Sequence, residues 1–442
     1  MEGLCDVPEE TDPMSRTAQA CLVALIITCA APAPAHAQGP ASCSTAGKNL
    51  YVRDVMTDLY LWYSAMPNVN PTSYASPEAY LDAVRYRTLD STFSYITSRA
   101  ANDAFYSDSQ FIGFGLSTLL NDLEMRVTQV FPESPAFEAG LSRGDRIVEI
   151  GGRLVTTLIS SGEIGTAFGP SEIGVESDIA FVSQAGTRRE AHMVKRLVTI
   201  PTVSLTRVYN VGGRRVGYIF FRNFVEPSYE ALDNAFAELS AARVDELVLD
   251  LRYNGGGLVS VAQYLAGYIG GVRTDGQVFA EYFHNDKNTF RNRILRFENK
   301  PQRLTLDRLI VVTTGSSASA SELIINALRP FMPVVVIGGR TYGKPVGQYG
   351  IAFCDKLFAV VSFALRNADG HGDFYDGFAP DCPAPDEADR QLGDPEEGSL
   401  KEALTFATTG ACSPRPLTPQ QKGDVQRRAP RALGWQSLVN AF

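Results

Sequence analysis

Residues 309–328 read LIVVTTGSSASASELIINAL, and this stretch decides the fold of the 442-residue chain. Its first five residues are apolar or β-branched, which is typical of a strand buried on both faces. A turn rich in serine follows, and residues 320–328 have the apolar spacing of a helix. The stretch therefore predicts a strand, a tight turn and a helix, the repeating unit of parallel α/β sheets.

The same rhythm recurs on both sides of this stretch. Further buried strands are predicted at residues 216–221, 246–251 and 334–337. Amphipathic helices are predicted at residues 228–239 and from Val259 onward. We therefore expect stacked βα units, forming one α/β domain over residues 199–412.

The region before this domain has a different texture. Residues 38–107 are predicted to be a small helical region, with apolar residues at helical spacing up to Trp62 and Tyr63. Pro67 and Pro71 should stop that helix, and Ser76-Pro77 should begin another. The simplest role for the many aromatic side chains of this region is core packing.

Residues 134–155 read SPAFEAGLSRGDRIVEIGGRLV, which resembles the helix, turn, strand and hairpin of a PDZ domain. Gly140 is placed to end the short helix, and Gly151-Gly152 to form the tight hairpin. The resemblance extends over residues 108–198. It implies a β domain with short helices that binds a peptide C-terminus as an added strand.

The loop expected to receive the terminal carboxylate contains Gly113, Phe114, Gly115 and Leu116. Glycines allow close backbone approach, and the two apolar side chains are candidates to line a pocket for the last residue of the peptide. The alternative is that these glycines only form a bulge. We favour the binding loop because the segment 134–155 supports it independently.

Three segments carry candidate chemistry: DLRYNGGGL (250–258), TGSSASASEL (314–323) and GGRTYGKPVGQ (338–348). Ser319 stands where a strand meets a helix, a suitable place for a nucleophile, although Ser319 and Glu322 also form a helix-capping pattern. No histidine lies in these segments, so the available base is Lys344. A lysine base requires a pKa lowered by burial, whereas most lysines are solvated.

In combination, the three segments resemble those of the carboxyl-terminal processing, or tail-specific, serine proteases. The resemblance implies a crotonase/ClpP-like stacked βα protease core. It implies Ser319 as nucleophile, Lys344 as base, Gln348 as the residue that orients Lys344, and the N–H groups of Gly257 and Ala320 as oxyanion hole. In an extended strand, four residues span about 13 Å, so spacing alone does not bring Gln348 to Lys344. Asp250 and Arg252 are interpreted as structural.

The N-terminus predicts a secretory signal peptide over residues 1–37. Residues 20–31 form an apolar run too short to span a bilayer, and Ala35-His36-Ala37 supplies a cleavage site. The acidic residues before Met14 do not suit a signal peptide, so Met14 is a candidate start. We expect export to the periplasm of a Gram-negative bacterium, or secretion, with no membrane span after cleavage. Residues 413–442 are expected to be a disordered tail.

Four of the seven cysteines follow the predicted cleavage site: Cys43, Cys354, Cys382 and Cys412. In an exported chain an even number suggests two disulfides, with three possible pairings. We prefer Cys354–Cys382 with Cys43–Cys412, because this pairing ties down both ends of the last domain. Free buried thiols are the alternative, and the absence of a CxxC pair argues against zinc.

Composition narrows the functional classes further. The net charge of −9 comes without a basic stripe, so we expect no nucleic-acid partner. Four histidines without metal-type spacing give no reason to expect a metal or cofactor. The sequence thus predicts an exported serine endopeptidase that cleaves proteins or peptides with free C-termini. The alternative is a catalytically silent PDZ-containing binding or scaffold protein, and a crotonase-like hydratase would leave the PDZ segment unexplained.

Overall fold

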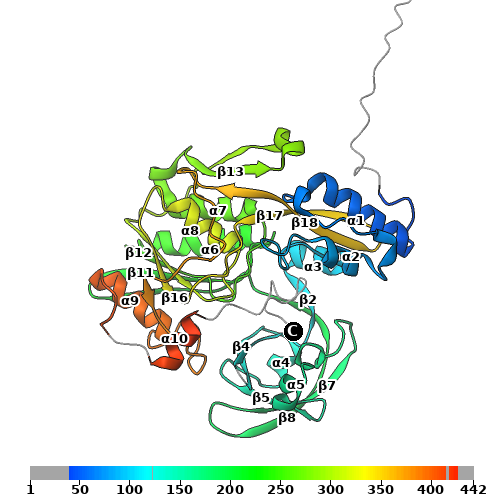
Figure 1. Ribbon diagram of the computed structural model, residues 1–442. Helices are drawn as coiled ribbons and strands as arrows, with labels where there is room; N and C mark the ends of the chain where they lie inside the picture. Colours follow the sequence, from blue (N-terminus) through cyan, green and yellow to red (C-terminus); the bar gives the residue numbers. More distant parts are fainter. Residues whose placement is uncertain (1–38, 122, 415–417, 427–442) are drawn as a thin grey trace, which may run out of the picture. The chain divides into compact units, whose positions relative to one another are not determined.

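The computed structural model of the protein describes residues 39–121, 123–414 and 418–426 (Figure 1). The predicted signal peptide and its candidate start at Met14 lie outside the described residues, as do residues 427–442 of the predicted tail. Within the described ranges, no helix is both long enough and apolar enough to cross a membrane.

Residues 309–328 form β15 (Leu309–Thr313) and α8 (Ala320–Leu328). β15 lies inside a six-stranded sheet of order β10-β11-β12-β15-β16-β19, parallel except where β10 meets β11. All five residues of β15 are buried, as expected for a central strand covered on both faces. The other strands of this sheet are β10 (Val203–Val211), β11 (Arg214–Phe221), β12 (Glu246–Asp250), β16 (Val334–Gly338) and β19 (Cys382–Pro383).

Helices cover both faces of this sheet. The helices are α6 (Ser228–Ala241), α7 (Val259–Gly270), α8 and α9 (Gly398–Thr409). Ile219 and Phe221 of β11 pack in one core cluster with the helices α6, α7 and α8, which follow β11, β12 and β15 in the chain. Tyr218 and Phe220 point to the other face and pack in a second cluster with the later helix α9. Figure 1 shows α9, in orange, on the opposite side of the sheet from the other three.

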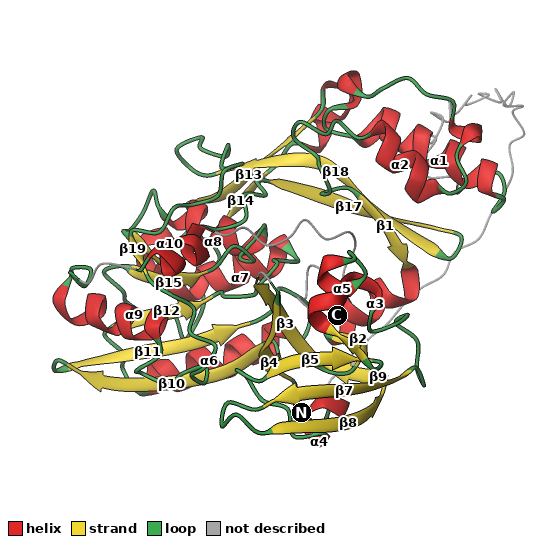
Figure 2. Ribbon diagram, turned by 60° about the horizontal axis from the view of Figure 1, so that its bottom comes forward, coloured by secondary structure: helices red, strands yellow, loops and turns green. Residues whose placement is uncertain are grey.

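A second sheet is built around β18 (Lys356–Arg366), which pairs antiparallel with β17, β13 and β1 (Figure 2). β1 comes from the N-terminal region, so the predicted small helical region at residues 38–107 also contains a strand, which the prediction missed. The aromatic and β-branched residues of β1 suit a strand, and β18 offers it a partner. The remaining members are β1 (Tyr95–Ser98), β13 (Val278–His284), β14 (Ile294–Arg296) and β17 (Val346–Phe353).

The N-terminal helices pack against this second sheet. α1 (Thr45–Leu59) and α2 (Pro77–Val84) are capped by the hydroxyls of Ser44 and Ser76, the second as predicted. The first helix ends earlier than predicted, before Trp62 and Tyr63, because the chain turns extended at Tyr60. Leu61 N–H then donates to the Val361 carbonyl at 2.9 Å. α3 (Arg99–Asp108) leads into the next region.

Residues 110–199 form a separate antiparallel sheet of order β3-β4-β5-β7-β8, with β6 on β5. The chain enters by β2 (Gln110–Gly113) and leaves by β9 (Arg196–Thr199), which pair with each other. Gly151 and Gly152 adopt φ 56° and 73° in the predicted tight hairpin. The elements are β3 (Leu116–Asn121), β4 (Glu124–Val130), α4 (Pro135–Glu138), β5 (Arg146–Ile150), β6 (Arg153–Leu154), α5 (Val155–Ser160), β7 (Glu176–Val182) and β8 (Arg188–Val194).

The four cysteines form two disulfides, but the preferred pairing is wrong. Cys43 bonds to Cys354 and Cys382 to Cys412, with Cα–Cα distances of 6.0 and 5.4 Å. Cys354 lies in the turn between β17 and β18, whereas Cys382 lies on β19 of the other sheet. A disulfide requires Cα atoms within about 7 Å, so each cysteine pairs with its neighbour in space.

Part of the tail predicted to be disordered is helical. α10 (Pro419–Gln426) is described, and its Val425 is buried. The Arg340 N–H donates to the Val425 carbonyl at 2.9 Å, which ties this helix to the segment after β16. The sequence of α10 is mostly polar, and its single buried valine is not enough to predict that the helix packs against the rest of the protein.

Candidate active site

Ser319 lies at the junction of β15 and α8, at the position predicted for a nucleophile. Its backbone has φ 57° and ψ −112°, a conformation that costs a non-glycine residue about 1–3 kcal/mol. Two neighbouring serines fix the turn: Ser317 donates to the Leu251 carbonyl at 2.7 Å and Ser321 to the Asn254 carbonyl at 2.9 Å. Of Ser317, Ser319 and Ser321, only Ser319 lines the cavity, so it is the serine of this turn that faces an incoming ligand.

Glu322, the partner of Ser319 in the predicted capping pattern, has a wider role. Its carboxylate is fully buried and accepts from Ser319 N–H at 2.9 Å. It also accepts from the N–H groups of Gly343 and Lys344 at 2.7 and 2.8 Å, and from the Thr341 hydroxyl at 2.6 Å. Burial raises the pKa of Glu322, and these four donors oppose the rise. One carboxylate thus joins the serine turn to the lysine segment.

Lys344 is 7% exposed and forms no ion pair within the described residues. Burial lowers the pKa of Lys344 to about 8, against the charges of Asp90 and Glu322, which favour the protonated form. Its Nζ atom lies 5.8 Å from the ring centroid of Phe93. An amine in this environment is neutral for an appreciable fraction of the time near neutral pH, as a general base requires.

Gln348 contacts Lys344 despite the length of an extended segment. Lys344 Nζ donates to Gln348 Oε1 at 2.7 Å, and Gln348 Nε2 donates to the Phe93 carbonyl. The register between β17 and β18 shifts between Gly347 and Gln348. Such a bulge changes the direction of the side chain from that in a regular strand. This is the physical reason that Gln348 reaches Lys344 although the two are four residues apart in an extended segment.

The glycine turn after β12 packs against the serine turn. A side chain at Gly256 would lie 2.8 Å from the Ala320 nitrogen, and one at Gly257 would lie 2.1 Å from the Phe224 carbonyl oxygen. Both glycines also have positive φ, 97° and 141°. The N–H groups of Gly257 and Ala320 make no hydrogen bond within the described ranges, and both residues line the cavity with Ser319.

Asp250 and Arg252 are fully buried and do not line the cavity. Arg252 forms ion pairs with Asp250 at 2.7 Å, Glu397 at 2.7 Å and Asp386 at 3.0 Å. Arg143 from residues 110–199 joins the same cluster, 2.8 Å from Asp386. These contacts anchor the base of the glycine turn, in keeping with the structural interpretation.

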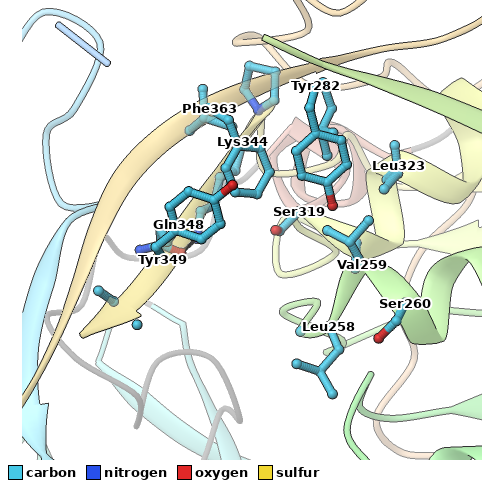
Figure 3. Close-up of a pocket in the computed structure, with 18 of the residues that line it drawn as sticks. Leu258, Val259, Ser260, Tyr282, Ser319, Leu323, Lys344, Gln348, Tyr349 and Phe363 are labelled. Carbon is cyan, nitrogen blue, oxygen red and sulfur yellow. Dashed lines mark hydrogen bonds between the residues drawn. The ribbon is translucent and has the colours of Figure 1, made fainter. Parts of the chain in front are cut away.

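The cavity has a volume of about 500 Å³ and contains Ser319, Lys344 and Gln348 among its lining residues. Figure 3 shows Lys344, Gln348 and Tyr349 on one side of Ser319, and Tyr282, Leu323 and Val259 on the other. Sequence reasoning missed the wall that the N-terminal region adds, formed by Tyr95, Asn102 and Tyr106. Only the pairing of β1 with β18 brings it there, and no local pattern signals that pairing.

The predicted peptide-binding loop joins β2 to β3. Phe114 and Leu116 are fully buried in the core of residues 110–199, and Gly115 has φ 81°. β3 is the last strand of its sheet, and among the described strands only β4 pairs with it. Its second edge therefore offers backbone groups to an added strand.

Comparison with known proteins agrees with this architecture. The family model for Peptidase family S41 matches residues 215–384, that for the Peptidase S41 N-terminal domain residues 48–95, and that for a PDZ domain residues 126–162. A crystal structure from Bacteroides fragilis, named "Putative S41 protease", covers 82% of this chain and 97% of its own, with TM-score 0.67 and 26% identity.

Curated relatives are carboxy-terminal processing proteases. The chain is 27% identical to that of Bartonella bacilliformis, over 60% of each protein. It is 27% identical to CtpB of Bacillus subtilis, over 56% of this chain and 50% of the relative. The match therefore spans less than two thirds of the length of either relative.

The fold and the matched segments resemble an S41 peptidase core joined to a PDZ domain. The chain is thus similar to the carboxy-terminal processing proteases and, over residues 215–384, to peptidase family S41.

Proposed function

We propose that this protein is an exported serine endopeptidase that cleaves proteins or peptides near their C-termini. One observation carries the proposal: Ser319, on a strained turn, shares a cavity with Lys344, whose pKa burial lowers to about 8. A serine needs a nearby base to become a nucleophile, and a buried lysine supplies one without histidine.

The reaction begins when neutral Lys344 takes the hydroxyl proton of Ser319. Ser319 Oγ attacks the scissile carbonyl carbon, and the N–H groups of Gly257 and Ala320 hold the oxyanion that forms. The C–N bond then breaks, and protonated Lys344 gives its proton to the leaving amine. Water activated by Lys344 hydrolyses the acyl-enzyme, releases the new C-terminus and restores the Ser319 hydroxyl.

We assign peptide docking to the open edge of β3 (Leu116–Asn121). A substrate C-terminus adds there as a strand, and the N–H groups of the loop from Gly113 to Leu116 receive its carboxylate. An upstream segment of the same substrate then reaches Ser319. Deletion of residues 108–198 should therefore change peptide affinity or regulation, and unchanged kinetics and selectivity would contradict this docking role.

We assign the protein to an oxidising compartment, the periplasm of a Gram-negative bacterium. Two disulfides among the described cysteines support this assignment, because disulfides persist in exported proteins and are rare in the cytosol. The predicted signal peptide over residues 1–37 supplies the route.

The test compares the wild-type protein with Ser319→Ala and Lys344→Ala in a periplasmic extract. New C-termini, identified by mass spectrometry, should form only with the wild type. A serine-reactive probe should label the wild type and not Ser319→Ala. Equal processing by the wild type and Ser319→Ala would contradict the proposal and favour a PDZ-containing binding protein.

A further inference from the structure

The lining of the active-site cavity carries very little charge. Lys344 and Arg293 are the only charged residues among the described residues that line it, and no carboxylate is present. Lys344 has a pKa of about 8 and must be neutral to act as a base. An arginine stays protonated at all ordinary pH values. Arg293 is therefore the permanent charge of this cavity.

The guanidinium of Arg293 is held against the cavity wall. Its central carbon lies 4.6 Å from the ring centroid of Tyr282, and Tyr282 N–H donates to the Arg293 carbonyl at 2.9 Å. Burial raises the pKa of Tyr282, and a hydrogen bond with Arg293 opposes the rise. Burial also raises the pKa of Tyr349, and the charge of Arg293 opposes this as well. Both tyrosines line the cavity, so the positive charge of the guanidinium influences groups inside the cavity.

Arg293 is exposed and pairs with no carboxylate within the described ranges. Arg296, which lies on β14 three residues further along the chain, donates to the Gly276 carbonyl at 2.9 Å and does not line the cavity. A solvated arginine on a protein surface needs no explanation. Arg293 differs because its charge is stacked on Tyr282, which Figure 3 shows beside Ser319.

We propose that Arg293 binds a carboxylate of the substrate next to the scissile bond, and that it thereby determines specificity. The inference rests on the proposed peptidase function for its biological meaning, but peptide binding tests it without cleavage. The carboxylate has two possible sources, an acidic side chain near the scissile bond or the free C-terminus of a short tail. A planar guanidinium suits either one by a bidentate contact.

The experiment measures peptide affinity in the Ser319→Ala protein, which holds peptides without cleaving them. The probes are fluorescein-labelled ten-residue peptides rich in alanine and leucine. One central position carries Glu, Gln or Lys, and the C-terminus is either free or amidated. Each peptide is titrated against Ser319→Ala alone and in combination with Arg293→Gln, Arg293→Glu or Arg296→Gln. The PDZ region is unchanged throughout, so its contribution cancels between variants.

We expect the Glu form or the free-acid form to bind about 5-fold to 10-fold more tightly than its neutral counterpart. Arg293→Gln should abolish the preference for Glu over Gln, or reduce the preference for the free acid to the part that the PDZ region supplies. Arg296→Gln should change neither preference, and Arg293→Glu should favour the Lys peptide. Whichever peptide, the Glu form or the free acid, loses affinity in Arg293→Gln identifies the source of the carboxylate. The preference should also shrink as salt rises from 50 to 500 mM.

The inference is overturned if Ser319→Ala prefers neither anionic form, if Arg293→Gln reduces neither preference, or if Arg296→Gln reduces them equally. Failure of the proposed function has a different signature. In that case the wild type cleaves none of the peptides, whereas the Arg293-dependent preference in binding persists.

Discussion

Lys344 Nζ lies 2.7 Å from Gln348 Oε1, and the acceptor character of that oxygen fixes how the amine is oriented. Gln348 Nε2 is engaged by the Phe93 carbonyl, so its amide cannot turn over without losing both bonds. A neutral amine has two N–H groups and one lone pair. When one N–H points to Gln348, the lone pair is free to face another direction, and the cavity with Ser319 offers one.

The rate of cleavage should rise with pH through the pKa of Lys344. Burial lowers this pKa to about 8, and the proposed mechanism requires the neutral form as base. At pH 7 about one tenth of the molecules then carry the neutral amine, so kcat/KM should increase about tenfold from pH 7 to pH 9. A peptide-cleavage assay across pH 6–10 measures the midpoint. A rate that is flat over this range, or that falls as pH rises, would contradict Lys344 as the base.

Replacement of Gln348 by glutamate should move that midpoint upward. A carboxylate 2.7 Å from Nζ would favour the protonated amine, so the pH profile of Gln348→Glu should have its midpoint above 8. Activity at pH 7 should fall at least tenfold and recover partly at high pH. Gln348→Leu serves as the matched variant, because it removes the hydrogen bond without adding charge. An identical midpoint in Gln348→Glu and the wild type would show that the two side chains do not interact.

Removal of the buried charge at Lys344 should stabilise the protein while abolishing activity. The folded-state pKa of about 8 lies below the ordinary value of 10.5, a gap equivalent to about 3 kcal/mol. Between pH 8 and 10.5 the unfolded chain therefore binds more protons than the folded protein. The burial of the protonated amine destabilises the fold fully below pH 8, and this destabilisation decreases as the pH rises toward 10.5. Lys344→Met should raise the free energy of unfolding in urea by up to about 3 kcal/mol at pH 7, with a smaller gain at pH 10. Destabilisation at pH 7 would contradict the shifted pKa.

Glu322→Gln should destabilise the fold and weaken catalysis together. All four groups that face the carboxylate are donors, so an amide would set its own N–H₂ against two of them. We expect a loss of about 2–3 kcal/mol in the free energy of unfolding. Glu230→Gln, at an exposed position on α6, is the matched control and should stay within about 0.5 kcal/mol of the wild type. Equal stability of the two variants would rule out Glu322 as the link between the two turns.

The disulfide pairing can be read directly by mass spectrometry of a non-reducing digest. Fragments that join Cys43 to Cys354 and Cys382 to Cys412 are expected, and a fragment joining Cys354 to Cys382 would contradict the structure. The double variant Cys43→Ser/Cys354→Ser should lose about 2–5 kcal/mol of unfolding free energy. This bond fastens the turn between β17 and β18, so the loss should be accompanied by reduced activity.

Sequence patterns predicted the local pieces of this protein well. The uninterrupted apolar run of β15 indicated a strand buried on both faces, and β15 occupies the predicted residues Leu309–Thr313. The segment 134–155 indicated its helix and hairpin because glycine positions and apolar alternation are set by neighbours along the chain. The turn at Ser319 could be predicted for the same reason, because the strand before it and the helix after it are its direct neighbours in the chain.

The rest depended on contacts between distant parts of the chain. Phe93 reaches Gln348 across 255 residues, and the cysteine pairs follow the arrangement of two sheets that the cysteine spacing does not encode. The sequence by itself determined most of the elements and the three chemical segments, and it made Lys344 the candidate base. Only the tertiary structure decided how deeply Lys344 is buried, that Gln348 touches it and that Glu322 binds both turns. The physical reason is that burial, desolvation and strand pairing depend on what the fold places nearby, whereas local periodicity depends on covalent neighbours.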